Sequence, residues 1–308
     1  MKPLLIIPPA PARWPGLREL PIHDHPLWWD DLQKRFAEGL PGTQDAFALI
    51  VDGGLVLACA GLCKRHDLGV LSRVFTRPEH RRRGFCRMLL EALIGWFDMS
   101  GGKWLYATTT ADLAEVCFRK LSFHTIRRAP RTPHDAVVLL RAVAGVPVDP
   151  LSTARGNVAI HDVARANWPT VATLLFNRPG PDPRVPLDES AVQAELTALE
   201  LLDQQEKGVC QLKAAFHGPR LVALASLATN VTGDRTYAMI TPHQDAPAAL
   251  REAVVALARA KGYQHVDFPM EALAPTGEAL RVPPAPASVP PAPGESGAAT
   301  SVESRTAL

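Results

Sequence analysis

Residues 70–108 follow an order that few folds satisfy: a strand, an arginine-rich turn, a helix and a second strand. The β-branched and aromatic residues from Val70 to Thr76 suit a strand. Apolar residues from Phe85 to Phe97 recur at three- and four-residue steps, which is the spacing of a helix with one buried face. A second strand is expected at residues 103–108. Two strands joined by a crossover helix predict parallel pairing with a right-handed connection, and therefore an α/β fold.

The turn before this helix predicts an anion site. A helix start leaves backbone N–H groups unpaired and carries partial positive charge, so an anion docks there readily. Gly84 brings no Cβ that would keep a phosphate away from the backbone. Cationic side chains crowd the same point: His80, Arg81, Arg82, Arg83 and Arg87. The pattern favours a pyrophosphate site, and the alternative is a solvated basic turn that caps an amphipathic helix.

Two motifs in this region resemble those of the Gcn5-related N-acetyltransferase (GNAT) family. The family signature Q/R-x-x-G-x-G/A, which follows a strand, is matched by RRRGFC at residues 81–86. The family ending Y-x-K-L-G-F of a later helix is matched by FRKLSF at residues 118–123. The resemblance spans residues 20–143. It implies a mixed central sheet flanked by helices, and an N-acyltransferase that takes its acyl group, most simply acetyl, from acetyl-coenzyme A.

The resemblance also implies which residues bind this cosubstrate. The backbone at the end of the first strand would face the thioester and the pantetheine arm, through Val74, Phe75 and Thr76. The turn and the helix start would hold the pyrophosphate, through Arg82, Arg83, Gly84, Phe85, Cys86 and Arg87. The acceptor would be an amine of a small molecule, a protein N-terminus or a lysine, which attacks the thioester directly. No metal is implied.

A general base is needed because the acceptor ammonium must lose a proton before it attacks. His66, Asp67 and Glu79 are the polar residues nearest to the expected transfer point. We take His66 and Asp67 as the candidate bases, and the alternative is that they are surface loop residues. Glu79 is expected to pair with the neighbouring arginines instead.

Three positions depart from the family pattern and motivate a second hypothesis. Cys86 replaces a smaller residue, Phe118 stands where many relatives have a proton-donating tyrosine, and Ala111 stands where an asparagine is common. The chain would then be a non-catalytic acyl-coenzyme A sensor or a protein-interaction module. A nucleic-acid binder is a third hypothesis, disfavoured because no aromatic platform accompanies the basic residues. Cys86 begins a helix among arginines, which predicts a lowered thiol pKa, and the alternative is that it is a small residue filling a tight turn.

Further elements complete a first domain over residues 21–145, after an extended arm at residues 1–20 that includes a short strand at residues 4–7. A helix is expected from His23 to Gly39, where Trp28 and Trp29 either pack in the core or flank a substrate. Two strand pairs are also expected, at 46–51 with 55–62 and at 124–128 with 136–143.

The second half, residues 158–272, repeats this order of strands and helices after a linker at residues 146–157. We interpret it as a second, degenerate GNAT-like domain, because HQDAPAAL at residues 243–250 lacks the glycines and arginines of the phosphate turn. Its role would be structural, or to close over the acceptor site of the first domain. Residues 273–308 are rich in proline and alanine and predict a disordered tail.

Composition sets few further limits. The 308 residues carry a formal net charge of +2, which does not favour a nucleic acid or a membrane surface as a partner. No apolar run approaches the length of a membrane span, and the first residues do not form a signal peptide. The five cysteines have no metal-ligand spacing. A cytoplasmic protein is expected.

Overall fold

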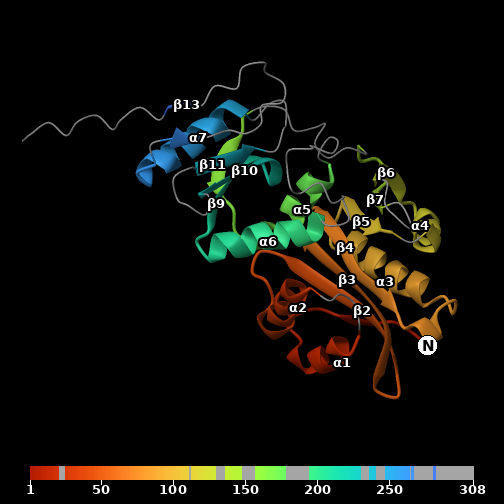
Figure 1. Cartoon of the computed structure of the whole chain (residues 1–308). Helices are drawn as coiled ribbons and strands as arrows, with labels where there is room; N and C mark the ends of the chain where they lie inside the picture. Colours follow the sequence, from red (N-terminus) through yellow and green to blue (C-terminus); the bar gives the residue numbers. More distant parts are fainter. Residues whose placement is uncertain are drawn as a thin grey trace, which may run out of the picture.

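A computed structural model of the chain describes two β-sheets with helices between and around them (Figure 1). A third, two-stranded pairing lies near the C-terminal end of the described part. The described residues are 1–20, 25–110, 112–129, 136–147, 157–177, 194–229, 236–240, 247–263, 265–266 and 280–281.

The larger sheet has seven strands in the order β1-β2-β3-β4-β5-β7-β6. Strands β4 and β5 run parallel, and every other neighbouring pair in this sheet is antiparallel. The mixed central sheet expected from the sequence is therefore confirmed. The strands are β1 (Leu4–Ile6), β2 (Gln44–Asp52), β3 (Leu55–Arg65), β4 (Leu68–Thr76), β5 (Trp104–Thr109), β6 (His124–Ala129) and β7 (Ala136–Ala142).

Helix α3 (Phe85–Met99) and helix α4 (Asp112–Arg119) cover one face of this sheet, where Leu89, Leu93 and Phe97 pack against alternate strand residues. Helix α1 (Trp14–Arg18) and helix α2 (Pro26–Glu38) lie against the opposite face. Strand residues alternate between these two clusters because successive side chains of a strand point to opposite faces.

The first twenty residues pack on this unit, and the short strand expected at residues 4–7 is confirmed, although the rest of the segment is not the extended arm expected from the sequence. Strand β1 pairs with β2, and a short 3-10 helix, η1 (Pro11–Arg13), leads into α1. Leu17 and Leu20 are almost fully buried. The prolines of this segment suggest an extended arm, but the apolar side chains between them are buried in the core.

The second sheet has four antiparallel strands in the order β11-β10-β9-β8. This order and pairing match those of β1 to β4, which supports a second GNAT-like domain without establishing it, so it stays a prediction. Its elements are β8 (Ala159–Asp162), η3 (Arg165–Asn167), α5 (Trp168–Phe176), α6 (Ala194–Glu206), β9 (Cys210–His217), β10 (Arg220–Thr229), β11 (Thr236–Ile240) and α7 (Pro247–Ala260).

Several predictions for the second half fall on residues outside the described ranges. These are residues 148–156 of the expected linker, residues 241–246 with Asp245, and residues 273–279 and 282–308 of the expected tail. Strand β13 (Leu280–Arg281) pairs with β12 (His265–Val266), so the second half includes two residues that the sequence assigned to the tail.

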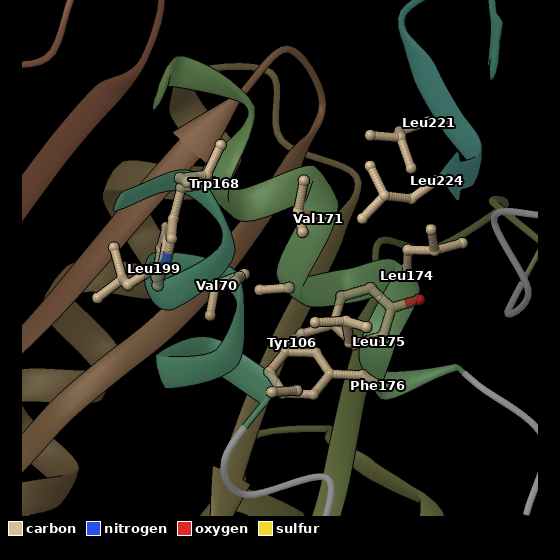
Figure 2. Close-up of a cluster of buried hydrophobic side chains, with 14 of the residues drawn as sticks. Val70, Tyr106, Trp168, Val171, Leu174, Leu175, Phe176, Leu199, Leu221 and Leu224 are labelled. Carbon is tan, nitrogen blue, oxygen red and sulfur yellow. The ribbon is translucent and has the colours of Figure 1, made fainter. Parts of the chain in front are cut away.

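One hydrophobic core joins the two halves of the chain (Figure 2). Helix α5 packs against β4 on one side and β10 on the other, so it lies between the two sheets. Figure 2 shows Val70 and Tyr106 of the first sheet meeting the side chains of α5, with Leu224 of β10 on the far side. Each large apolar side chain buried here contributes about 1.5–3 kcal/mol relative to exposure. The second half is thus an integral part of the fold around the first sheet.

Candidate functional site

The first sheet opens between β4 and β5. The parallel ladder runs from the Leu68–Trp104 pair to the Leu71–Ala107 pair and stops there, although β4 continues to Thr76 and β5 to Thr109. The register of β3 with β4 shifts next to this point, and Arg73 adopts a positive φ of 56°. Such a bulge bends its strand and increases the local twist. The end of β4 therefore presents an edge that β5 does not pair.

The arginine-rich turn lies at the mouth of this gap. It leaves the end of β4 through a 3-10 helix, η2 (Pro78–His80), and leads directly into α3. The Arg81 Nε donates to the carbonyl oxygen of Thr76 at 3.2 Å, which ties the turn to β4. Arg82 and Arg83 are exposed and make no ion pair with any residue the structure describes. Two free cationic groups thus lie beside the unpaired N–H groups of a helix start.

Gly84 is the N-cap of α3 and has a φ of 80°. A Cβ at this position would meet no atom within 4 Å, so the space in front of the helix start is open. The requirement for glycine is therefore the left-handed backbone conformation, which side chains other than glycine adopt at a cost. The space beside Gly84 can admit a phosphate, as the sequence suggested. Neighbouring protein atoms, however, would not exclude a larger side chain at this position.

The structure brings together the predicted coenzyme residues and separates them from the predicted bases. Residues 74–76 follow the unpaired edge, and residues 82–87 form its mouth. His66 and Asp67 lie in the turn before β4, roughly 23–26 Å along the chain from Val74 at 3.3 Å per residue. The Asp67 carboxylate is 3.4 Å from Lys103 Nζ. The backbone carbonyl oxygen of Asp67 accepts hydrogen bonds from the backbone N–H groups of Lys103 and Trp104. Both residues belong to a structural turn away from the gap.

Cys86 differs from expectation because it faces a second thiol. A hydrogen bond with Cys117 of α4, together with burial, raises the pKa of Cys86. The same hydrogen bond lowers the pKa of Cys117 to about 7, with help from Arg87 and Lys120. The predicted lowering at Cys86 is wrong, since the stabilised thiolate belongs to its neighbour.

Phe118 is a core residue. Its ring meets that of Phe123 edge to face, with centroids 5.1 Å apart, and both side chains are about 2% exposed. At the position where the resemblance implies a proton donor, this chain therefore has a side chain that packs in the core. Ala111 lies outside the described residues.

Trp28 packs in the core, where it is almost fully buried. Its ring lies beneath the Arg73 guanidinium, 4.4 Å from the ring centroid, which is a cation–π contact. Trp29 is partly buried and meets Trp14 edge to face at 5.8 Å. Of the two interpretations left open by the sequence, core packing is the one the structure supports.

A buried ionic network surrounds Arg73 on this face of the sheet. Asp31 of α2 accepts from Arg35 at 2.7 Å and from Arg73 at 3.3 Å, and its other oxygen lies 3.2 Å from Arg165 of η3. Burial alone would raise the pKa of Asp31, but these arginines hold it below its ordinary value. The Arg73 Nε is buried and has no hydrogen-bond partner among the residues that the structure describes.

Glu195 of α6 reaches the same region from the second half of the chain. Its Oε1 accepts a hydrogen bond from Thr108 Oγ1 at 3.3 Å, and Thr108 is the first β5 residue beyond the last ladder pair. The residue is 5% exposed. Burial raises the pKa of Glu195 to about 7, while Arg73, Thr108 and Arg35 act in the opposite direction.

Sequence reasoning missed Glu195, although a signal was present. It stands four residues before Leu199 and seven before Leu202, both of which are almost fully buried. An acidic residue on the apolar stripe of a helix must be neutral, paired or functional, because an isolated buried charge is costly.

Within the described ranges, no group of three or more His, Cys, Asp or Glu residues is placed to hold a metal ion. In the same part of the chain, no helix combines the length and the apolar character that a membrane crossing requires.

Residues 14–122 match the family model of the Acetyltransferase (GNAT) family. This match spans about a third of the chain and contains the gap, the turn and helix α3. It identifies the first unit as GNAT-like, in agreement with the two motifs found in the sequence.

Two solved structures show the same likeness at low identity. The ribosomal-protein-S18-alanine N-acetyltransferase from Escherichia coli is 18% identical over 47% of this chain and 97% of its own, with a TM-score of 0.38. An acyl-CoA N-acyltransferase from Pseudomonas aeruginosa is 18% identical over 32% of this chain and 69% of its own, with a TM-score of 0.29. At these values neither likeness bears on the activity of this chain. No curated protein is significantly similar to it.

Proposed function

We propose that the first unit is an acyl-coenzyme A dependent N-acyltransferase, most simply an N-acetyltransferase that acts on an amine. The observation that carries the proposal is the ladder between β4 and β5, which stops at Leu71–Ala107 and opens a gap beside the arginine-rich start of α3. A gap between parallel strands with an anion site at its mouth suits a long cosubstrate that has a pyrophosphate at one end.

The cosubstrate would bind as an added strand. The pyrophosphate would accept hydrogen bonds from the N–H groups at the start of α3, with Arg82 and Arg83 as counter-charges. The pantetheine amides would pair with the backbone of residues 74–76 along the edge that β5 leaves unpaired, as extended ligands pair with exposed strand edges. This arrangement brings the thioester to the inner end of the gap, beside Arg73.

The reaction would be a direct transfer. The acceptor nitrogen attacks the thioester carbonyl, a C–N bond forms, the C–S bond breaks and the coenzyme leaves as a thiolate that takes up a proton. A backbone N–H near Val74 or Phe75 would stabilise the negative charge that develops on the carbonyl oxygen. The acceptor would carry its amine on a small molecule, a protein N-terminus or a lysine.

A thiol-release assay tests this function. Purified protein and acetyl-coenzyme A are offered a panel of amines, and free thiol is measured together with the mass of the acetylated product. In R82E/R83E we expect the KM for acetyl-coenzyme A to rise at least tenfold, because two charges opposite the pyrophosphate are reversed. The matched control is R13E/R18E, which reverses two exposed arginines of η1 and α1. Equal effects of the two double variants would contradict the site.

A second candidate function is a non-catalytic acyl-coenzyme A binding module. It is favoured by Phe118, which is buried against Phe123 where a proton donor would help the thiolate to leave. A positioned acid is typically worth about 10²–10⁴-fold in rate, so its absence slows transfer without forbidding it. The two candidates differ in one result: the module binds acetyl-coenzyme A and releases no thiol with any amine.

A further inference from the structure

We propose that Glu195, contributed by the second half of the chain, is the general base that deprotonates the acceptor ammonium. This role rests on the proposed N-acyltransferase function and deepens it. It also gives the second half a part in the reaction, because Glu195 of α6 contacts Thr108 near the end of β5.

The position of Glu195 follows from the strand that it touches. Trp104 and Tyr106 of β5 point into the core shared with α5, so Thr108, two residues further on, points to the same face. Thr108 directly follows the last residue that pairs with β4. The Glu195 carboxyl, bonded to Thr108, therefore lies at the inner end of the gap, on the face of the sheet opposite α3.

The charges around this point also favour a base there. Arg73 comes from the β4 bulge and Arg35 from α2, and Thr108 of β5 donates the hydrogen bond. No ion pair within 4 Å joins Glu195 to any residue the structure describes, in contrast to Asp31, which meets three arginines. A structural carboxylate is normally neutralised by such partners. Glu195 instead is held by the Thr108 hydroxyl, with no arginine within ion-pair distance among the described residues.

The environment tunes this carboxyl for the task. Burial raises its pKa to about 7, against the opposing effects of Arg73, Thr108 and Arg35. About half of the molecules would then carry the carboxylate at pH 7. A base is most effective when its pKa lies near the working pH, and groups perturbed in this way concentrate at functional sites.

Protons balance across the step. The acceptor ammonium gives one proton to the Glu195 carboxylate and becomes a neutral amine. The amine attacks the thioester carbonyl, and the C–N bond forms as the C–S bond breaks. The nitrogen loses its second proton to the departing thiolate, directly or through water. Glu195 then returns its proton to solvent, which leaves an amide, free coenzyme A thiol and one proton.

The test compares E195Q with E200Q in the full-length protein. Glu200 lies on the same helix and is partly exposed, so E200Q makes the same chemical change away from the gap. In E195Q we expect kcat to fall about 10²–10⁴-fold, the usual range for a lost general base, while the Kd for acetyl-coenzyme A is unchanged. The acidic limb of the wild-type pH–rate profile, centred near pH 7, should disappear. E200Q should keep both rate and profile.

A second variant keeps the test decisive if E195Q folds poorly. The Thr108 hydroxyl lowers the pKa of Glu195, so T108V should move the acidic limb to higher pH without abolishing the reaction at alkaline pH. If T108V leaves the limb in place, or if folded E195Q keeps the wild-type rate and profile, the role of Glu195 is overturned.

Failure of the proposed function gives a different result. A wild-type protein that releases no thiol with any amine overturns the acyltransferase proposal, and the role of Glu195 with it. An active wild-type protein with an unaffected E195Q variant overturns the role of Glu195 alone.

Discussion

At the residue scale, the thiol pair beside the phosphate turn shows how a neighbour can reverse an expectation drawn from a helix start. Cys86 has the position that should favour a thiolate, but its thiol donates a hydrogen bond to Cys117. This hydrogen bond and burial both raise the pKa of Cys86. The pair loses its first proton as a unit, and the charge resides on Cys117, close to Arg87 and Lys120.

We predict that Cys117 is alkylated faster than Cys86 by iodoacetamide near neutral pH. Its rate should be half-maximal near pH 7, because the Cys86 hydrogen bond lowers its pKa to about that value. In C86A the midpoint should rise toward the ordinary thiol value of about 8.5, since the donor is lost. Peptide mass spectrometry across a pH series measures both rates. Faster modification of Cys86 than of Cys117 would contradict this prediction, because it would mean that Cys86 carries the thiolate.

Glu195 has a second measurable consequence, in the pH dependence of folding. Its pKa is raised to about 7 in the folded protein from an ordinary value of 4.5, so between these values the folded state holds more protons than the unfolded state. The free energy of unfolding must therefore fall as pH rises through this window. A shift of this size corresponds to about 3 kcal/mol for a fully buried group.

We predict that E195Q removes this slope. The glutamine does not titrate, so the difference in unfolding free energy between wild type and E195Q should change by about 3 kcal/mol between pH 4.5 and pH 8, in favour of E195Q at the higher pH. Urea unfolding at several pH values measures it, with E200Q as the matched control. Parallel pH profiles for wild type and E195Q would mean that Glu195 ionises as it does in the unfolded chain.

At the element scale, Asp31 of helix α2 makes ion pairs to two other elements. Asp31 joins its own helix to β4 through Arg73 and to η3 through Arg165. Arg35 extends the network to Asp45 of β2, at 3.0 Å. Removing one member of a buried ion network is costly because the remaining charges lose their partner.

We predict that D31N lowers the free energy of unfolding by about 3–5 kcal/mol, because it leaves three buried or half-buried arginines without their shared carboxylate. D30N is the control, since Asp30 is the neighbouring aspartate on the exposed side of α2. Its effect should stay within about 0.5 kcal/mol. If urea unfolding gives the two variants the same stability, the network contributes nothing net to the fold.

The helices and strands could be predicted from the sequence where a local residue pattern determines them. The parts of the candidate site that depend on contacts between distant residues could not be predicted. Strand β4 and helix α3 lie where the residue spacing and Gly84 predict them. The contact of Thr108 with Glu195 joins residues 87 positions apart in sequence, and no local spacing encodes it. His66 and Asp67 are close to the gap along the chain, but a strand carries residues away from its own start by about 3.3 Å each.

At the scale of the whole molecule, the two halves share one core through α5 and α6. Trp168 is fully buried, its Nε1 donates to the carbonyl oxygen of Glu195 at 3.1 Å, and Arg35 of α2 stacks on its ring. The first sheet and the second half therefore stabilise each other. A linker between separate domains, which the small residues and prolines at 146–157 suggested, would not create such dependence.

We predict that the described part of the chain unfolds as one cooperative unit. W168A should lower the free energy of unfolding by about 3–5 kcal/mol, the usual cost of removing a buried aromatic side chain. Hydrogen exchange should show equal destabilisation of amides in β2 and β3 and in β9 and β10. Destabilisation confined to the second sheet would show that the halves are independent.

The most direct test of the central claim, that acetyl-coenzyme A binds at the gap and the start of α3, is calorimetric titration of the full-length protein. We predict micromolar binding to wild type, and loss of binding in G84V, because valine at φ 80° distorts the turn that presents the N–H groups. G218V is the control, with a similar φ of 58° and open space in the turn between β9 and β10. It should bind as wild type does. No heat of binding with the wild-type protein, or equal binding to G84V, would contradict the account.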